Sequence, residues 1–348
     1  MSLLGEIELA GVLINKGLIG RKKFVGGEVR FTLADRRNRN IRITIRDAVG
    51  LFTKQAKTPE GKTTLEHEWA FLKMLERTKD ELSQHLPRNI YYDRKLNLLV
   101  LELIPSGRSM HDLLMQQWGE LASQSASVGR AIGRLHNRPV SSDALSLKRG
   151  PIAFGWNKPP YSLLKNISPA NVRLIAAVQA DAPLSEGLDQ LHLDWRSTSL
   201  VHGDAKLDNI LIGPDGVFLV DWELATVGDP RWDMATIFSS FLSSWVATMP
   251  MAHGVGIDLM TRQARISLAT IQGCVRPLWN AYADTRGISR IDRFLEGTVA
   301  YCGARLVQTA YEYMQYANRL TANAVYLLQI AANLIKDPRR GLRLIFGA

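Results

Sequence analysis

The sequence is poor in cysteine, and its opening residues lack the pattern of a signal peptide. Its 348 residues include two cysteines, Cys274 and Cys302, which form no Cys-x-x-Cys pair. This excludes a disulfide framework and a cysteine-ligated zinc site, and it favours the reducing cytoplasm as the compartment. The opening residues, MSLLGEIELAG, include two acids and lack the basic start and long apolar run of a signal peptide.

Long uncharged runs are also scarce. The longest one lies between Asp233 and Asp258, and it contains four serines, a proline and a histidine. This composition predicts a core helix and its connection rather than a membrane span, so we expect no membrane partner.

Acidic residues are in the minority, with 33 against 43 lysines and arginines, which gives a net charge of +10. Much of the excess lies in the first 46 residues, and a smaller cluster closes the chain. A basic balance favours anionic partners such as nucleotide phosphates, an acidic peptide or nucleic acid. The alternative is an ordinary solvated surface.

The first hundred residues carry the pattern of a small antiparallel sheet. EVRFTLAD (28–35) and IRITIRD (41–47) alternate between apolar and polar residues, which predicts a half-buried hairpin. A third strand is expected over 49–55, with Lys54 embedded in it, and two more over 89–93 and 98–104. Taken alone, Lys54 is better explained as an edge-strand charge.

One helix is expected among these strands. Residues 63–82 show helical apolar spacing after a polar linker, with Thr63 or Thr64 as the cap and Glu66 completing a capping box. Glu68 lies close to the apolar face of this helix. It reads as a solvated charge unless Lys54 is its partner.

Near residue 104 the pattern changes from alternation to helical periodicity. We therefore predict an α+β chain with two lobes. The first, 1–104, holds the small sheet and one helix, and the second, 105–348, is larger and mainly helical.

The residues with chemical potential gather in the stretch 200–235. His-Gly-Asp-x-x-x-x-Asn covers 202–209, and Asp-Trp-Glu follows at 221–223, after a second apolar strand. Asp204 can accept or orient a hydroxyl proton. Asn209 and Asp221 offer the hard oxygen ligands that Mg²⁺ prefers. This set suits phosphoryl transfer, which depends on positioning and charge neutralisation.

HGDAKLDN, LVDWE and VGDPRWDMA together resemble the aminoglycoside phosphotransferase and choline kinase group, distant relatives of protein kinases. The resemblance covers roughly residues 28–335, and LVLELIPSGRSMHDLL and the helix ending in GRLH also match it. It implies a bilobal protein kinase-like fold, with ATP and Mg²⁺ as cofactors.

The resemblance also implies roles for single residues. Asp204 is the expected base or hydroxyl-orienting residue, and Asn209 and Asp221 are expected to hold Mg²⁺. Nucleotide contacts are expected from a set of four residues: Lys54 on the phosphates, Glu68 as its helix partner, and the backbone of Glu102 and Ile104 on the adenine. Structural support is expected from three more: His202, Asp229 and Asp233.

The chain departs from the family pattern at two places. The loop Arg36–Asn40 has no glycine, so its arginines either clasp phosphate or face solvent. Lys206, two residues after Asp204, matches protein kinases rather than antibiotic kinases. We expect it to stabilise charge in the transition state.

The acceptor is open between several classes. A net charge of +10 disfavours polycationic aminoglycosides, and a similarity to kinases of peptide natural-product biosynthesis suggests Ser or Thr of a precursor peptide, with a separate lyase as partner. The alternatives are a small-molecule hydroxyl and a pseudokinase scaffold that binds nucleotide. Nucleic acid ranks last, because no aromatic residue interleaves the basic segment RRNRN at 36–40.

Overall fold

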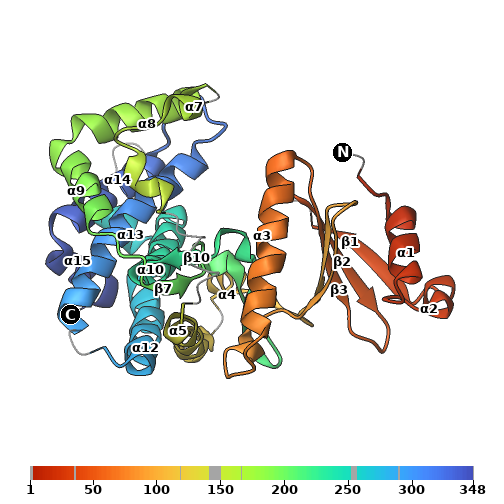
Figure 1. Ribbon diagram of the computed structural model, residues 1–348. Helices are drawn as coiled ribbons and strands as arrows, with labels where there is room; N and C mark the ends of the chain where they lie inside the picture. The colour runs from red at the N-terminus through yellow and green to blue at the C-terminus, as the bar shows by residue number, and fades with distance from the viewer. Residues whose placement is uncertain are drawn as a thin grey trace. The chain divides into compact units, whose positions relative to one another are not determined.

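The computed structural model describes residues 3–34, 37–117, 119–140, 150–165, 167–251, 257–288 and 291–347 (Figure 1). The chain divides into two compact units. Unit 1 comprises residues 1–108 and 211–225, and unit 2 comprises residues 109–210 and 226–348. The sequence pattern placed a boundary near residue 104 and assigned 211–225 to the second lobe, whereas in the structure this segment folds with unit 1.

Unit 1 is built on a five-stranded antiparallel sheet with the order β1-β2-β3-β5-β4. Its strands are β1 (Val29–Leu33), β2 (Arg39–Ile45), β3 (Leu51–Gln55), β4 (Asn89–Asp93) and β5 (Leu98–Glu102). Its helices are α1 (Glu6–Asn15), α2 (Arg21–Val25), α3 (Pro59–Glu76) and the short η1 (Ser83–His85). The predicted hairpin is confirmed, with Val29 opposite Ile45 and Leu33 opposite Ile41.

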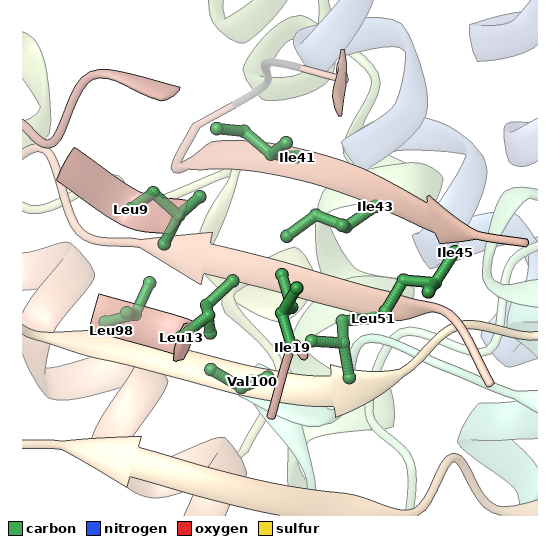
Figure 2. Close-up of a cluster of buried hydrophobic side chains, with 9 residues drawn as sticks. All are labelled: Leu9, Leu13, Ile19, Ile41, Ile43, Ile45, Leu51, Leu98 and Val100. Atoms are coloured by element: carbon green, nitrogen blue, oxygen red, sulfur yellow. The ribbon is translucent and has the colours of Figure 1, made fainter. Parts of the chain in front are cut away.

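The core of this sheet follows the alternation in the sequence. From Ile41 onward every second residue of β2 is buried, namely Ile41, Ile43 and Ile45, because successive side chains of a strand point to opposite faces. Leu9 and Leu13 of α1 pack against them in the cluster that Figure 2 shows. In Figure 1, α1 and α2 cover one face of the sheet and α3 covers the other.

Helix α3 begins earlier than the sequence pattern predicted. Its cap is Thr58, whose hydroxyl accepts a hydrogen bond from the amide of Gly61 at 3.1 Å. The predicted cap at Thr63 or Thr64 is therefore wrong, and the supposed linker forms the first turns of the helix. Pro59 explains the start, since proline fits the first helical position, where no amide donor is needed.

Unit 2 is mainly helical. Its longer helices are α5 (Leu121–Asn137), α8 (Pro169–Ala180), α9 (Ala182–Leu193), α10 (Arg231–Ala247), α12 (Leu268–Arg286), α13 (Ile291–Tyr313), α14 (Ala322–Lys336) and α15 (Pro338–Phe346). Shorter helices are α4 (Met110–Met115), η2 (Ile152–Gly155), α7 (Tyr161–Leu164), η3 (Leu207–Asn209) and α11 (Ile257–Arg262). A two-stranded antiparallel ladder joins β7 (Ser199–Val201) to β10 (Thr226–Gly228).

A second, three-stranded sheet has the order β6-β8-β9. Its strands are β6 (Arg108–Ser109), β8 (Ile210–Gly213) and β9 (Gly216–Leu219), and η4 (Trp222–Leu224) follows β9. The uncharged stretch after Asp233 lies mostly in α10, which is almost wholly buried. Within the described ranges, no helix is both long enough and apolar enough to cross a bilayer.

Helices α5 and α12 approach each other closely at a glycine. A Cβ atom placed on Gly129 of α5 would lie 2.0 Å from the carbonyl oxygen of Leu278 on α12, far inside contact distance. A Cβ atom on Gly133, one turn later, would lie 2.8 Å from the side chain of Thr285. The two helices can therefore pack at this distance only because glycine occupies the contact.

We predict that Gly129→Ala destabilises the protein by about 3 kcal/mol, because overpacking against a backbone carbonyl forces the helices apart. The matched control is Gly273→Ala in α12, where an added Cβ meets nothing within 4 Å. This control should stabilise by about 0.5–1 kcal/mol through helix propensity. Urea unfolding of both variants measures the difference, and equal shifts in the two variants would contradict the close approach.

Candidate functional site

In unit 1, one lysine lies between two carboxylates from different parts of the chain. Lys54 on β3 donates to both oxygens of Glu68 on α3, at 2.8 Å each, and to Oδ1 of Asp221 at 2.6 Å. Lys54 and Glu68 are buried, whereas the Asp221 side chain is 38% exposed. The structure therefore brings together three of the residues that the sequence analysis selected.

The carboxylates keep this lysine charged. Burial alone would lower the pKa of Lys54, but the negative charges of Asp221 and Glu68 outweigh that effect and raise the pKa. Burial is also the largest influence on Glu68 and raises its pKa, against the opposing pull of Lys54. The ammonium group is thus fixed in place and cationic.

The segment that carries Asp221 is held against α3. Asp221 has φ of 68°, in the left-handed region that aspartate tolerates better than most residues. The next residue, Trp222, is fully buried and stacks on Phe71 of α3 at 5.9 Å between ring centroids. Its amide also donates to Glu68 at 3.3 Å. The unusual backbone conformation at Asp221 is thereby stabilised by packing on its C-terminal side.

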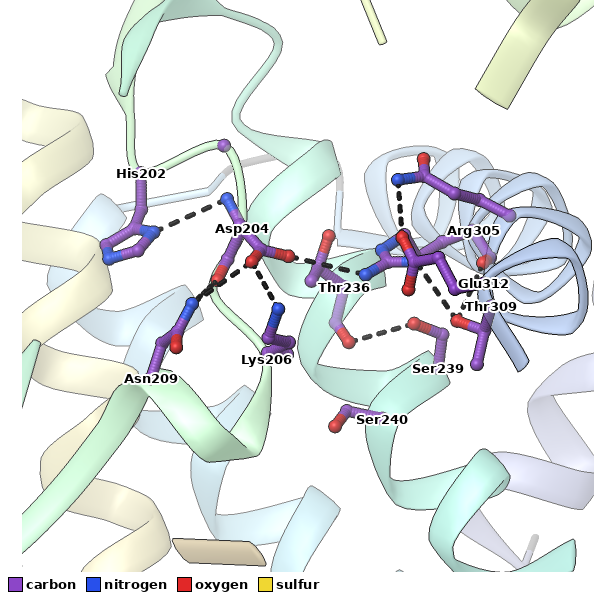
Figure 3. A network of polar contacts seen from close by, with 12 residues as sticks. His202, Asp204, Lys206, Asn209, Thr236, Ser239, Ser240, Arg305, Thr309 and Glu312 are labelled. Atoms are coloured by element: carbon purple, nitrogen blue, oxygen red, sulfur yellow. Dashed lines mark hydrogen bonds and ion pairs between the residues drawn. The ribbon is translucent and has the colours of Figure 1, made fainter. Parts of the chain in front are cut away.

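In unit 2, the carboxylate of Asp204 is the centre of a polar network (Figure 3). Its Oδ2 accepts hydrogen bonds from Lys206 Nζ at 2.6 Å and from Asn209 Nδ2 at 3.1 Å. Burial would lower the pKa of Lys206, but Asp204 outweighs burial and raises it. Because the amide nitrogen of Asn209 is turned to Asp204, its carbonyl oxygen is the atom left to ligate a metal.

The backbone of this loop is fixed by a buried carboxylate. Asp233 on α10 accepts hydrogen bonds from the amides of His202 at 2.7 Å and Gly203 at 2.9 Å. Gly203 has φ of 81°, which glycine adopts without strain, and its carbonyl accepts from Trp232 Nε1 at 3.0 Å. Asp233 thus supports the loop as expected.

Of the other two expected supports, one lies at the loop and one does not. Asp229 binds Arg231 and the amide of Arg196, so it fixes the segment before β7 rather than the loop itself. His202 is fully buried, and its ring Nδ1 lies 3.4 Å from the amide nitrogen of Asp204. The histidine therefore lies beneath the loop, in a position to support it.

A buried histidine completes the support. Nε2 of His136 on α5 lies 3.0 Å from Oδ2 of Asp233, and its Nδ1 lies 3.0 Å from the hydroxyl of Tyr282. Burial lowers the pKa of His136, against the opposing pull of Asp233. A neutral ring that donates from Nε2 to Asp233 and accepts at Nδ1 from Tyr282 satisfies all three groups.

Arg305 is a member of this network that the sequence analysis missed. Its Nη2 lies 3.3 Å from Oδ1 of Asp204, although 101 residues separate the two in sequence. The signal in the sequence was weak: a single charged residue within the apolar run YCGARLVQTAY of α13. A lone arginine in such a run indicates a buried polar partner, because an arginine is rarely buried without one.

The remaining expected contacts stay predictions. The amide of Glu102 donates to the carbonyl of Arg88 at 2.9 Å, and the carbonyl of Ile104 accepts from Gly107 at 3.2 Å. In the glycine-free loop, Arg36 lies outside the described residues, while Arg37 is half exposed and lies 3.5 Å from Glu223. No group of three or more His, Cys, Asp or Glu placed to hold a metal occurs among the residues described.

The buried His136–Asp233 pair predicts how stability depends on pH. Folding lowers the pKa of His136 below the ordinary histidine value of 6.5. As the pH falls through 6.5, this histidine therefore binds a proton in the unfolded chain, whereas in the folded protein it binds one only at lower pH. The free energy of unfolding should therefore decrease between pH 7.5 and 5.5. Asp233, whose pKa is also lowered because its hydrogen bonds outweigh burial, adds a further loss only at more acidic pH, below about 4.

His136→Asn should flatten the slope between pH 7.5 and 5.5, because asparagine does not titrate. Urea unfolding at several pH values, with wild type and variant side by side, measures the two slopes. An unchanged slope in the variant would show that another group carries the proton.

Comparison with known proteins identifies the family of the chain. The model of the phosphotransferase enzyme family (APH) matches residues 28–258, more than half of the chain. Curated relatives include acyl-CoA dehydrogenase family member 11 of Pongo abelii, 29% identical over 157 residues, which covers 42% of this chain and 19% of that protein. Acyl-CoA dehydrogenase family member 10 of Mus musculus is 43% identical over 126 residues, covering 34% of this chain and 11% of that protein.

Solved structures share the fold. Choline kinase LicA from Streptococcus pneumoniae is 16% identical with a TM-score of 0.52, covering 92% of this chain and 99% of that one. The ADP-bound aminoglycoside phosphotransferase APH(2″)-Ib is 13% identical with a TM-score of 0.54, covering 95% and 99%. These structures confirm the predicted bilobal kinase-like α+β fold, and the family match confirms the prediction of a phosphotransferase enzyme. The chain belongs to the phosphotransferase enzyme family.

Proposed function

We propose that the chain transfers the γ-phosphate of ATP to an alcohol hydroxyl of a small molecule, with Mg²⁺ as the metal. The observation that carries the proposal is the Asp204 carboxylate, which Lys206 and Asn209 hold on a loop of the phosphotransferase motif. Asp204 would orient the acceptor hydroxyl and take its proton as the new bond to phosphorus forms.

The nucleotide would bind through the residues of unit 1. Lys54, held charged by Glu68 and Asp221, would pair with the α- and β-phosphates. Glu102 and Ile104 would hydrogen-bond the adenine through their backbone groups. Support for ATP comes from the family and from the kinase-like structures, one of which binds ADP.

Asp221 and Asn209 would hold the metal. The partly exposed carboxylate of Asp221 and the amide carbonyl of Asn209 are hard oxygen donors, which fit Mg²⁺. When bound, Mg²⁺ neutralises charge on the β- and γ-phosphates. Lys206 would leave Asp204 to stabilise the transferring phosphoryl group, since its side chain is 35% exposed and can turn.

The acceptor is proposed to be anionic rather than cationic. Choline and aminoglycosides carry positive charge, which a protein of +10 attracts poorly at long range. The curated relatives are named for acyl-CoA dehydrogenases, and the matched part covers less than a fifth of their length. A hydroxyl on an acyl chain carried by CoA fits both observations: the CoA phosphates are negative, and the relatives are named for enzymes of acyl-CoA.

A precursor peptide remains a second candidate acceptor. Its support is the basic charge alone, which favours an acidic leader segment. The lyase that such a pathway requires would be a separate protein.

We predict that Asp204→Asn lowers kcat by about 100-fold or more, because asparagine cannot take the hydroxyl proton. The KM for ATP should stay within about two-fold, since Asp204 binds no nucleotide in this scheme. Steady-state ADP release in the presence of acceptor measures both constants. Equal activity of variant and wild type would refute the role of Asp204, and a wild type that binds ATP without turnover would favour a pseudokinase scaffold.

One panel of candidate acceptors, assayed with ATP, distinguishes the acceptor classes. We expect ATP-dependent phosphate transfer to hydroxyacyl-CoA thioesters, and little to choline, an aminoglycoside or a serine-containing acidic peptide. Mass spectrometry for the added phosphate reads out every acceptor in the same way. Preferred transfer to the peptide would reverse the ranking of the two candidates, and preferred transfer to an aminoglycoside would refute the argument from charge.

A further inference from the structure

We propose that Arg305 is a positioning residue for Asp204, which holds the carboxylate in the orientation that the acceptor hydroxyl requires. The inference rests on the proposed function, in which Asp204 receives that hydroxyl. It adds to the site a residue on α13, outside the motif over 202–209.

The two oxygens of Asp204 are held by different partners. Lys206 and Asn209 both bind Oδ2, whereas Arg305 binds Oδ1 (Figure 3). The terminal torsion of an aspartate is soft and would otherwise let the carboxylate rotate. Since each carboxylate oxygen can accept more than one hydrogen bond, Oδ1 retains a place for the acceptor hydroxyl.

Arg305 is itself fixed on α13. Its side chain is 4% exposed, and Nη1 donates to Thr309 Oγ1 at 3.0 Å and approaches both oxygens of Glu312 at 3.3 and 3.4 Å. Glu312 is held in turn by Gln308 Nε2 at 2.9 Å. All four residues lie on the same helix, so the guanidinium is anchored before any substrate binds.

The two cations on Asp204 differ in mobility. Lys206 makes one short contact from a partly exposed, flexible side chain, and in the proposed mechanism it turns to the phosphate. Asp204 then retains Asn209 on Oδ2 and Arg305 on Oδ1. Arg305 is therefore the cation that keeps Asp204 in place during transfer, and a displacement of about 1 Å can cost about 100-fold in rate.

A purely structural role explains this arginine poorly. Burying a guanidinium is costly in desolvation, and replacing a whole buried ion pair by well-packed apolar residues is often neutral for stability. Asp204 and Glu312 are 15% and 43% exposed, so solvent can reach both if the arginine is removed. A methionine could fill the space on α13, which means that packing alone does not require the charge.

The test compares Arg305→Met and Arg305→Lys with wild type. We expect Arg305→Met to lower kcat by about 100-fold and to leave the KM for ATP within about two-fold. Arg305→Lys should restore part of kcat, because lysine returns the positive charge but lacks the planar set of N–H donors of the guanidinium. Arg276→Gln is the control: it removes an arginine contact to the carbonyl of Phe346 at 2.6 Å, and kcat should stay within about two-fold.

A double-mutant cycle with Asp204→Asn separates positioning from a general effect on the fold. If Arg305 acts through Asp204, adding Arg305→Met to Asp204→Asn should lower kcat little further. Equal factors in both backgrounds, or a kcat of Arg305→Met within about three-fold of wild type, would overturn the proposal.

If Arg305→Met fails to fold, Arg305→Lys and Glu312→Gln decide the question. Glu312→Gln weakens the anchor of Arg305 without touching Asp204, so kcat should fall with an unchanged KM for ATP. Wild-type kcat in both variants would overturn the positioning role. A wild type that transfers no phosphate to any acceptor would instead refute the proposed function, which distinguishes the two failures.

Discussion

The loop that carries Asp204 depends on one buried carboxylate. Asp233 accepts two backbone amide hydrogens of the loop, and His136 donates a third hydrogen bond to it from α5. Removing such a charge from water is costly unless several donors compensate it, so the arrangement is stable only when all of them are present. The position of Asp204 thus follows from the packing of α5 and α10, and α5 in turn is placed by its glycine contact with α12.

The same principle holds in unit 1, with the signs reversed. There a buried cation, Lys54, is compensated by Glu68 and Asp221, and the stacking of Trp222 on Phe71 holds the second carboxylate near the first. Each unit therefore presents a preformed charged group: an ammonium in unit 1 and a carboxylate in unit 2. Preorganised charge is the main means by which a protein assists phosphoryl transfer.

Local patterns predicted much of this fold. The alternation in 41–47 predicted the burial of Ile41, Ile43 and Ile45, because the period of two is a property of the strand itself. The start of α3 was missed, because Thr58 and Pro59 were read as a linker although both are typical of a helix start. The pairing of Lys54 with Glu68 was expected only through the family resemblance, since alternation and helical spacing alone left both residues as surface charges.

The sequence by itself determined the strands of the sheet, the loop motif over 202–209 and, through that motif, the family. Spacing suffices there because the motif residues are neighbours in the chain and their geometry is local. Only the tertiary structure decided that Arg305 contacts Asp204, that His136 contacts Asp233, and that Trp222 fixes Asp221. The first two pairs join residues 101 and 97 positions apart, and Trp222 is itself held by a hydrogen bond to Glu68, 154 positions away. These contacts exist because folding brings distant parts of the chain together. A buried polar group must find a partner, but the sequence does not say which one.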